Sequence, residues 1–122
     1  MPGLTVLAAG DNPYLAPTDT FPAEITELVN LTTLYLSAAN IGGVIPVDIG
    51  QLTRLVDLEL TDNNLMGEIP QTISQLVNLQ SLELYNNSLT GAFPPGFGKL
   101  TNLQLFDASM NALTGNLSVL VF

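Results

Sequence analysis

Acidic side chains recur at a constant interval in this sequence. Glu59, Glu83 and Asp107 are spaced 24 residues apart, and Tyr35 precedes Glu59 by the same interval. A row of carboxylates can pair with Lys or Arg side chains of a ligand, coordinate Ca²⁺, or supply the acid and base of a glycosidase. Each of these three functions requires a fold in which residues 24 positions apart in the sequence lie next to each other.

The calcium and glycosidase interpretations both lack supporting features. The spacing expected between neighbouring carboxylates is longer than a single cation favours, and no ligand loop closes around them. A glycosidase needs a pocket that desolvates one carboxyl group, and a regular repeat surface provides none. The chain has no Cys and no His, which excludes disulfides, thiolate metal sites and histidine general bases. We therefore expect no catalytic residues, no metal site and no cofactor.

The charge balance restricts the class of partner. The chain carries 11 acidic and 2 basic residues, for a net charge of −9. Nucleic acids and anionic membrane surfaces are recognised through Lys and Arg, so neither is expected as a partner. No apolar run approaches the roughly 20 residues of a membrane span, and Met1-Pro2-Gly3-Leu4 lacks the basic start of a signal peptide. A basic peptide or protein fits the charge better.

The interval of the carboxylates is the period of a repeat that covers nearly the whole chain. Leu31, Leu55, Leu79 and Leu103 each open a similar block, and a Gly recurs at positions 43, 67, 91 and 115. Chance does not produce so many columns with one period. We expect one domain over residues 1–122, uncapped at both ends, with repeats at about 4–30, 31–54, 55–78, 79–102 and 103–122.

Each block specifies a short strand followed by a turn. The alternation in Leu58-Glu59-Leu60 places both leucines on one face of a strand and the intervening residue on the other. Because one coil cannot bury its apolar face alone, the blocks must stack into an α/β solenoid of about five coils, with a parallel β-sheet on its concave side.

An Asn follows most of these strands. Its side-chain amide can hydrogen-bond the turn and the adjacent coil, so that successive Asn residues form a ladder along the solenoid. Ala39 interrupts the series in the second block. The ladder residues are Asn12, Asn63, Asn87 and Asn111.

The second half of each block carries a distinctive motif. It reads Gly43-Val44-Ile45-Pro46 and Gly67-Glu68-Ile69-Pro70, with Phe in place of Ile in Gly91-Ala92-Phe93-Pro94. Together with the preceding Leu-x-x-Leu-x-Leu-x-x-Asn, the block resembles the plant-type leucine-rich repeat. The resemblance implies a superhelical twist, a second short strand near the motif, and few or short 3-10 or α turns on the convex side.

Two further stretches are similar to the ectodomains of plant leucine-rich-repeat receptor-like kinases of the HAESA/HAIKU-like subfamily. They are Gly10-Asp11-Asn12-Pro13-Tyr14 and Phe106-Asp107-Ala108-Ser109-Met110-Asn111. The resemblance implies a secreted peptide as ligand, a co-receptor, and a location at the extracellular face of the plasma membrane within a parent receptor. Relatives hold the peptide carboxylate with two arginines. Arg54 and Lys99 lie off the strand faces, so we do not expect that carboxylate site in this stretch.

The strand residues that face away from the leucines form the candidate ligand-binding surface. Carboxylates there would pair with Lys or Arg of an extended basic peptide, and tyrosines would supply rigid contact area. The alternative is a solvated, weakly acidic sheet face, because exposed strand positions are polar in any case. The candidate residues are Tyr35, Asp57, Glu59, Asp62, Glu83, Tyr85 and Asp107.

Three Asn-x-Ser/Thr triplets are candidate N-glycosylation sites, beginning at Asn30, Asn86 and Asn116. Their presence agrees with an extracellular type of repeat. A glycan on Asn86 would stand at the rim of the concave face and partly block it.

Three functional hypotheses remain. The first is a non-catalytic peptide- or protein-binding segment of a receptor-like kinase ectodomain, whose Ser/Thr kinase domain this chain does not contain. The second is a small secreted defence protein of the polygalacturonase-inhibitor type, which predicts a signal peptide and cysteine caps. The third is an ice-binding or purely structural solenoid. Ice binding favours a regular Thr array, and the threonines here keep no single repeat position.

Overall fold

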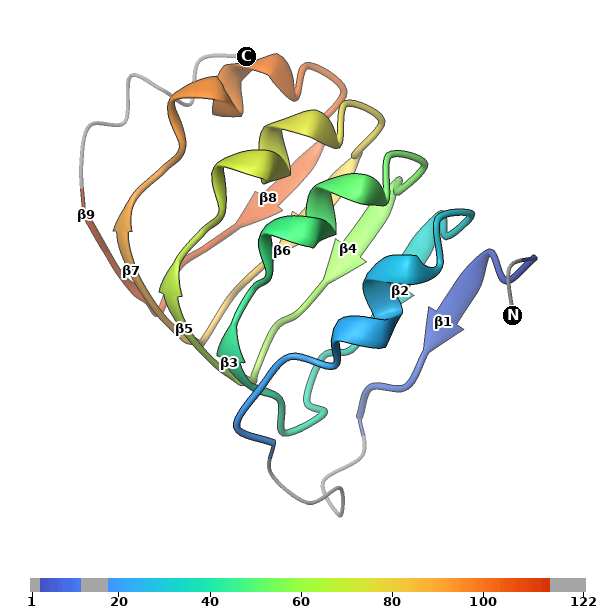
Figure 1. Ribbon diagram of the computed structural model, residues 1–122. Coiled ribbons are helices and arrows are strands. Elements are labelled where there is room, and N and C mark those ends of the chain that lie inside the picture. The colour runs from blue at the N-terminus through green and yellow to red at the C-terminus, as the bar shows by residue number, and fades with distance from the viewer. Residues whose placement is uncertain (1–2, 12–17, 115–122) are drawn as a thin grey trace.

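The concave side of the solenoid is a parallel sheet made from one three-residue strand per coil. The computed structural model describes residues 3–11 and 18–114. The strands are β1 (Val6–Ala8), β2 (Thr33–Tyr35), β4 (Asp57–Glu59), β6 (Ser81–Glu83) and β8 (Leu105–Asp107). They form a five-stranded sheet in the order β1-β2-β4-β6-β8, so each coil pairs with the next along the chain (Figure 1).

The register of this sheet follows the sequence period. Leu34 pairs with Leu58, which pairs with Leu82, and Leu82 pairs with Phe106. Because side chains alternate along a strand, these residues point into the core while their neighbours point to the concave surface. The fold therefore turns a separation of 24 residues into adjacency on one face.

A second parallel sheet lies near the Gly-x-Ile-Pro motifs. Its strands are β3 (Gly42–Val44), β5 (Asn64–Glu68), β7 (Ser88–Ala92) and β9 (Ala112–Thr114), paired in that order. Gly67 has a φ of 73°, and a side chain there would meet Val44 of the neighbouring coil. Glycine therefore allows both the backbone bend and the close approach of the coils. The second strand that the family resemblance implied is present.

The remaining segment of each coil is a 3-10 helix. The four described are η1 (Ala23–Glu27), η2 (Val47–Gln51), η3 (Gln71–Gln75) and η4 (Pro95–Lys99). Each follows a proline in extended conformation and is closed by a Leu N–H that bonds the carbonyl three residues earlier, as Leu76 does to Ile73 at 3.1 Å. The described residues contain no α-helix, so the turns are all of the 3-10 kind, and the predicted leucine-rich-repeat solenoid is confirmed.

The core runs continuously along the stack. Leu58, Leu65, Leu76 and Leu79 are completely buried, and their counterparts in adjacent coils contact them. Phe97 packs against Phe106 with ring centroids 5.0 Å apart near the last described coil. Burial of this shared apolar stripe is what stabilises coils that have no long helix or strand of their own.

No helix among the described residues is long and apolar enough to cross a lipid bilayer.

Candidate functional site

The strands place four of the predicted residues in one row on the concave face. Tyr35 pairs with Glu59, Glu59 with Glu83, and Glu83 with Asp107. All four side chains are partly exposed, so the row is open to a ligand from the concave side. Neighbouring parallel strands lie about 4.8 Å apart, which sets the spacing of the row.

Tyr35 is held at one end of the row by a carboxylate from the preceding coil. Its hydroxyl donates a 2.5 Å hydrogen bond to Asp11 Oδ2. That bond, with smaller contributions from burial and from the Glu59 and Glu83 charges, raises the pKa of Tyr35 to about 12. The ring lies against Gly10, where a Cβ would approach it to 2.5 Å. Tyr35 is therefore a fixed, uncharged hydrogen-bonding group.

Glu59 and Glu83 form the centre of the row. Burial is the largest of the effects that together raise the pKa of Glu59 to about 7, followed by hydrogen bonding with the Glu83 carboxyl group and the charge of Asp57. Because burial and neighbouring negative charge both disfavour the ionised form, the Glu59 carboxyl group keeps its proton up to near neutral pH. A ligand cation placed here would favour loss of that proton.

Asp57 lies one residue before the core Leu58 and beside this pair. Burial raises the pKa of Asp57, the Glu83 charge adds to the effect, and the nearby Ser81 hydroxyl opposes it. Asp57 Oδ1 and Ser81 Oγ are nevertheless buried with no partner that meets hydrogen-bond geometry in the described part of the chain. The partly desolvated Asp57 carboxyl group therefore has acceptor capacity left.

Asp107 closes the far end of the row and differs in its environment. The Ser109 hydroxyl and backbone N–H donate to Asp107 Oδ1 at 2.6 and 3.0 Å. These bonds lower the pKa of Asp107, so it is ionised across the physiological range. The row thus runs from the neutral phenol of Tyr35, through Glu59 with its raised pKa and Glu83, to the firmly charged carboxylate of Asp107.

Asp62 and Tyr85 lie outside this row, at the turn that follows the strands. Asn86 Nδ2 donates to Asp62 Oδ1 at 2.9 Å, and Tyr85 is 36% exposed. Both Asp62 and Asn86 adopt a positive φ. The seven predicted residues therefore do not form one group. Tyr35, Glu59, Glu83 and Asp107 form the row, and Asp57 lies at one flank. Tyr85 and Asp62 lie at the other flank in two successive columns, of which the one that holds Asp62 and Asn86 is the turn column.

Two residues that contribute to the surface were left out of the predicted set, namely Asp11 and Ser109. Asp11 is equivalent to Ala38 in the turn column, since Asp11 N–H donates to Ser37 O as Ala38 N–H donates to Thr61 O. The two residues are 27 rather than 24 apart, so the longer first repeat has to be aligned separately before Asp11 can be identified. Ser109 falls two residues after Asp107, a spacing at which a hydroxyl commonly bonds a carboxylate locally.

The Asn side chains at the ends of the strands connect consecutive coils. Asn63 Nδ2 donates to Leu36 O and Leu60 O, both at 3.0 Å, and Asn63 Oδ1 accepts from Ala39 N–H and Ile41 N–H. Asn87 and Asn111 repeat this pattern one and two coils further on. Asn12 lies outside the described residues. This ladder holds the turn that carries Asp62 and Asn86.

Asn30, Asn86 and the two basic residues lie outside the row. Asn86 is exposed at the end of the concave sheet, Asn30 is half-buried beside Leu31, and Asn116 falls outside the described residues. Arg54 is exposed just before Leu55, and Lys99 ends η4 on the convex side. Among the described residues, no cluster of three or more Asp, Glu, His or Cys side chains is arranged to hold a metal ion.

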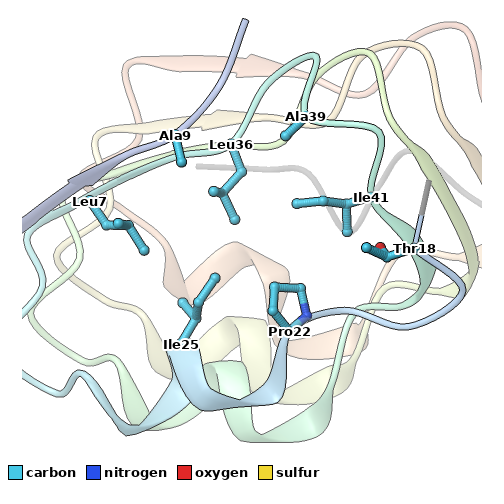
Figure 2. A pocket seen from close by; sticks show the side chains of 8 residues that line it. All are labelled: Leu7, Ala9, Thr18, Pro22, Ile25, Leu36, Ala39 and Ile41. Atoms are coloured by element: carbon cyan, nitrogen blue, oxygen red, sulfur yellow. The ribbon is translucent and has the colours of Figure 1, made fainter. Parts of the chain in front are cut away.

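An apolar cavity of about 240 Å³ lies inside the first coil, separate from the acidic row. Figure 2 shows side chains from β1, η1 and the second coil pointing into it. Two of its lining positions carry small residues: Ala9 stands where later coils have Leu60 and Leu84, and Ala39 stands where they have Asn. The lining residues are Leu7, Ala9, Thr18, Pro22, Ile25, Leu36, Ala39 and Ile41.

Comparison with protein families identifies the repeat independently. The model described as Leucine Rich Repeat matches residues 30–52, 54–76 and 78–100, which make up more than half of the chain. A comparison with curated protein sequences returned no match.

Solved structures with the same fold include plant receptor kinases that were crystallised in complexes. The Arabidopsis receptor kinase HAESA, in complex with the peptide hormone IDA and the co-receptor SERK1, is 41% identical with a TM-score of 0.86, over 91% of this chain and 18% of that one. The Arabidopsis thaliana receptor kinase GASSHO1/SCHENGEN3, in complex with CASPARIAN STRIP INTEGRITY FACTOR 2, is 40% identical with a TM-score of 0.74, over 80% and 12%.

A plant ice-binding protein is also similar. It is 34% identical with a TM-score of 0.79, and the match covers 98% of this chain and 45% of that protein. This chain therefore spans less than half of the ice-binding protein and less than a fifth of the two receptor kinase chains.

Proposed function

The chain belongs to the leucine-rich repeat family, and on that premise we propose that it is a non-catalytic binding module for an extended, basic peptide or protein segment. The ligand lies across the strands of the concave sheet. It places cationic side chains against Glu59, Glu83 and Asp107, and it packs against Tyr35 and Tyr85. The module acts as part of a receptor ectodomain at the extracellular face of the plasma membrane.

The observation that carries this proposal is the row of acidic side chains on one open face. Glu59, Glu83 and Asp107 occupy equivalent positions of consecutive strands, and both cations of the chain lie elsewhere. An extended peptide that crosses parallel strands meets one row position per coil. Charge-assisted hydrogen bonds to Lys or Arg would then recur along the peptide.

The similar receptor kinases support a peptide as the ligand class. HAESA was solved with a peptide hormone and a co-receptor, and GASSHO1/SCHENGEN3 with CASPARIAN STRIP INTEGRITY FACTOR 2. For this chain we propose the same kind of role, with a co-receptor as a second partner. Glycans on Asn30, Asn86 and Asn116 would be consistent with that location, and a glycan on Asn86 would limit access to the turn column.

Calorimetric titration with a short Lys- and Arg-containing peptide, beside a peptide of the same length with Glu at those positions, tests the proposal. We expect the basic peptide alone to bind, and Glu83→Gln to weaken it by about tenfold. Asp48→Asn is the matched control, because it removes the same charge from the exposed convex turn of η2. Equal weakening by the two substitutions, or binding of the acidic peptide, would contradict recognition by the concave row.

A second candidate function is ice binding, favoured by the match that covers 98% of this chain. The exposed side of the second sheet carries small or hydroxyl side chains in its later coils, including Ser88, Thr90, Ala112 and Thr114. The same column holds Met66 in an earlier coil, so the surface is not a regular array. Thermal hysteresis of the purified chain, measured with and without Thr90→Lys, separates this function from peptide binding.

A further inference from the structure

A surface hollow of about 290 Å³ lies between the third and fourth coils, which span residues 55–78 and 79–102. Described coils stack on both sides of this pair, so the hollow belongs to the middle of the solenoid. The third coil contributes Glu68, Ile69 and Gln71 to its lining. The fourth coil contributes Ala92, Phe93, Pro94 and Pro95.

The fourth coil departs from the repeat at the residues that form the hollow. Ala92 is smaller than the residues at the equivalent positions of the two preceding coils, so it leaves space above its strand. Phe93 replaces the usual Ile, and its ring packs edge-on against Phe97 with centroids 5.5 Å apart. Pro94 and Pro95 restrict the backbone of the adjoining wall. The hollow is therefore a rigid feature that the sequence of these two coils specifies.

Glu68 supplies the charge in this hollow. Its side chain lies across Gly91 of the fourth coil, where an added Cβ would come within 2.9 Å of Glu68 Cδ. Gly91 has a φ of 76°, so this position favours glycine and keeps the space that Glu68 occupies. Neither cation of the chain lines the hollow, and within the described part of the chain the Glu68 carboxylate has no hydrogen-bond or ion-pair partner. The carboxylate is therefore held in position with its charge unpaired.

Exposed apolar side chains lie beside this carboxylate on the same face of the second sheet. Met66 precedes Glu68 by two residues in β5, so the two side chains point to the same face, roughly 7 Å apart along the strand. Val44 of β3 pairs with Met66, and the two residues are 52% and 55% exposed. This face thus offers a negative charge next to an apolar strip, on a different sheet from Glu59 and Glu83 (Figure 1).

A side chain with a cationic end and an apolar stem matches the hollow. Lys and Arg side chains pack their methylene groups on apolar surface while the charged end reaches a polar partner. Phe93 and Pro95 supply apolar contact for such a stem. Glu68 supplies a carboxylate for a charge-assisted hydrogen bond, and the Gln71 amide oxygen is a further acceptor. A neutral or acidic side chain in the same place would leave the Glu68 charge unpaired and partly desolvated.

We propose that this face is a docking surface for a second protein, which inserts one Lys or Arg side chain between the two coils and pairs it with Glu68. An apolar side chain of the same partner packs on Met66 and Val44. The spacing suits an extended segment of the partner, because residues two apart in such a segment are separated as Met66 and Glu68 are. The docking surface and the concave row lie on different sheets, so the concave ligand and this partner are bound at separate places.

Chemical-shift mapping of the isotope-labelled chain by NMR tests the docking surface. The probe is the capped tripeptide acetyl-Leu-Gly-Arg-amide, and its neutral match is acetyl-Leu-Gly-Gln-amide. We expect the Arg peptide to shift the amide signals of Gln71, Gly91 and Ala92 in a saturable way, and the Gln peptide to bind about tenfold more weakly. Absence of these shifts at peptide concentrations up to about 10 mM, or equal affinity for the two peptides, would overturn the proposal.

Substitutions on this face and away from it determine whether Glu68 provides the recognition. Glu68→Gln should weaken binding of the Arg peptide by about tenfold, whereas Glu24→Gln, which removes the same charge from exposed η1, should leave it unchanged. Glu68→Lys should reverse the preference, so that acetyl-Leu-Gly-Glu-amide binds in place of the Arg peptide. Met66→Ser should weaken the Arg peptide several-fold through lost apolar contact. Equal affinities of the Glu68→Gln and Glu24→Gln variants, an unchanged preference in Glu68→Lys, or full affinity in Met66→Ser would contradict the docking model.

The same titration separates this surface from the concave row, whose carboxylates also attract the Arg peptide. The amide signals of Glu83 and Ser109 report on the concave row, and Glu83→Gln should reduce their shifts while the shift of Gly91 is retained. Glu68→Gln should have the opposite effect. Shifts at Gly91 that disappear with Glu83→Gln would overturn a separate docking surface. Shifts confined to Gly91 and its neighbours would support the docking surface and contradict binding at the concave row.

Discussion

Glu59 and Glu83 occupy paired positions on the neighbouring parallel strands β4 and β6, and Glu83 contributes to the raised pKa of Glu59. The register of β4 and β6 brings these two acidic residues together on the concave face. It concentrates negative charge at the centre of the concave face. It also stores unfavourable electrostatic energy that a cationic ligand can relieve, which connects the stability of the fold to its proposed function.

The first prediction concerns pH. The pKa of Glu59 is raised from 4.5 to about 7 in the folded chain, so between these values the folded state binds more protons than the unfolded state. Stability must then fall as pH rises from about 4.5 to about 7, and level off above it. Urea unfolding at several pH values measures this. Glu59→Gln should remove most of the pH dependence of the free energy of unfolding. If that variant shows the same pH dependence, the effect arises from other titratable groups.

The second prediction concerns the Asn ladder. Asn63→Ala leaves the Ala39 and Ile41 N–H groups and the Leu36 carbonyl without their side-chain partner. We expect a loss of roughly 2 to 4 kcal/mol in the free energy of unfolding, since each buried group left unpaired costs about 1 to 3 kcal/mol. Asn64→Ala is the control, because Asn64 is exposed and should change stability by less than about 0.5 kcal/mol. Similar losses in the free energy of unfolding of both variants would show that the Asn ladder does not stabilise the fold.

The third prediction concerns backbone conformation at Ala38. This residue has a φ of 54°, which an L-residue adopts at a cost of about 1 to 2 kcal/mol. Ala38→Gly removes that cost, but glycine also gives the unfolded chain more conformational entropy, which offsets part of the gain. We therefore expect stabilisation by about 0.5 to 1 kcal/mol. In strand β7, Ala92→Gly should instead destabilise the chain. Thermal denaturation followed by circular dichroism compares the two, and a lower melting temperature for Ala38→Gly would refute the prediction.

The fourth prediction concerns the core. Leu58 and Leu82 are completely buried in consecutive strands, and replacing either by Ala creates a cavity between coils. We expect a loss of about 2 to 5 kcal/mol in the free energy of unfolding. Val77→Ala, at a position 47% exposed, should cost far less. Melting curves of Leu58→Ala that coincide with those of the unaltered chain would contradict the stacked core.

The fifth prediction concerns the cavity in the first coil. Ala9→Leu restores the residue type found at Leu60 and Leu84, and its side chain would enter the apolar space between β1 and η1. We expect stabilisation by about 0.5 to 2 kcal/mol. Ala8→Leu, one position away on the concave face, supplies the same added surface outside the cavity and serves as the control. Chemical denaturation distinguishes them, and an equal gain in both would argue against cavity filling.

Much of the concave surface could be predicted from the sequence because the repeat period dictates the register. Once Leu34, Leu58 and Leu82 are assigned to one buried column, Tyr35, Glu59 and Glu83 must share the opposite face. The Asn positions follow from the same count of residues. The second sheet could be expected only from the resemblance to the plant-type repeat. The residues near Gly67 show no alternation of apolar and polar side chains that would predict a strand there.

The remaining features depend on contacts and backbone conformations that the repeat period does not predict. The hydrogen bond from Tyr35 to Asp11 joins residues of different columns, and it required the ring to lie against Gly10. The positive φ of Ala38 and Met110 arises because the turn imposes one backbone path on every coil, whatever residue occupies it. Local sequence preference would have placed Asn or Gly there.

The amino-acid sequence by itself determined the solenoid, its period and the set of side chains on each face. A repeated pattern of buried leucines has only one way to align its coils, since a shift of register would expose the core. The tertiary structure alone decided how those side chains interact. Burial and distance, which set the pKa of Glu59 and the polar partner of Tyr35, are properties of packed atoms in three dimensions.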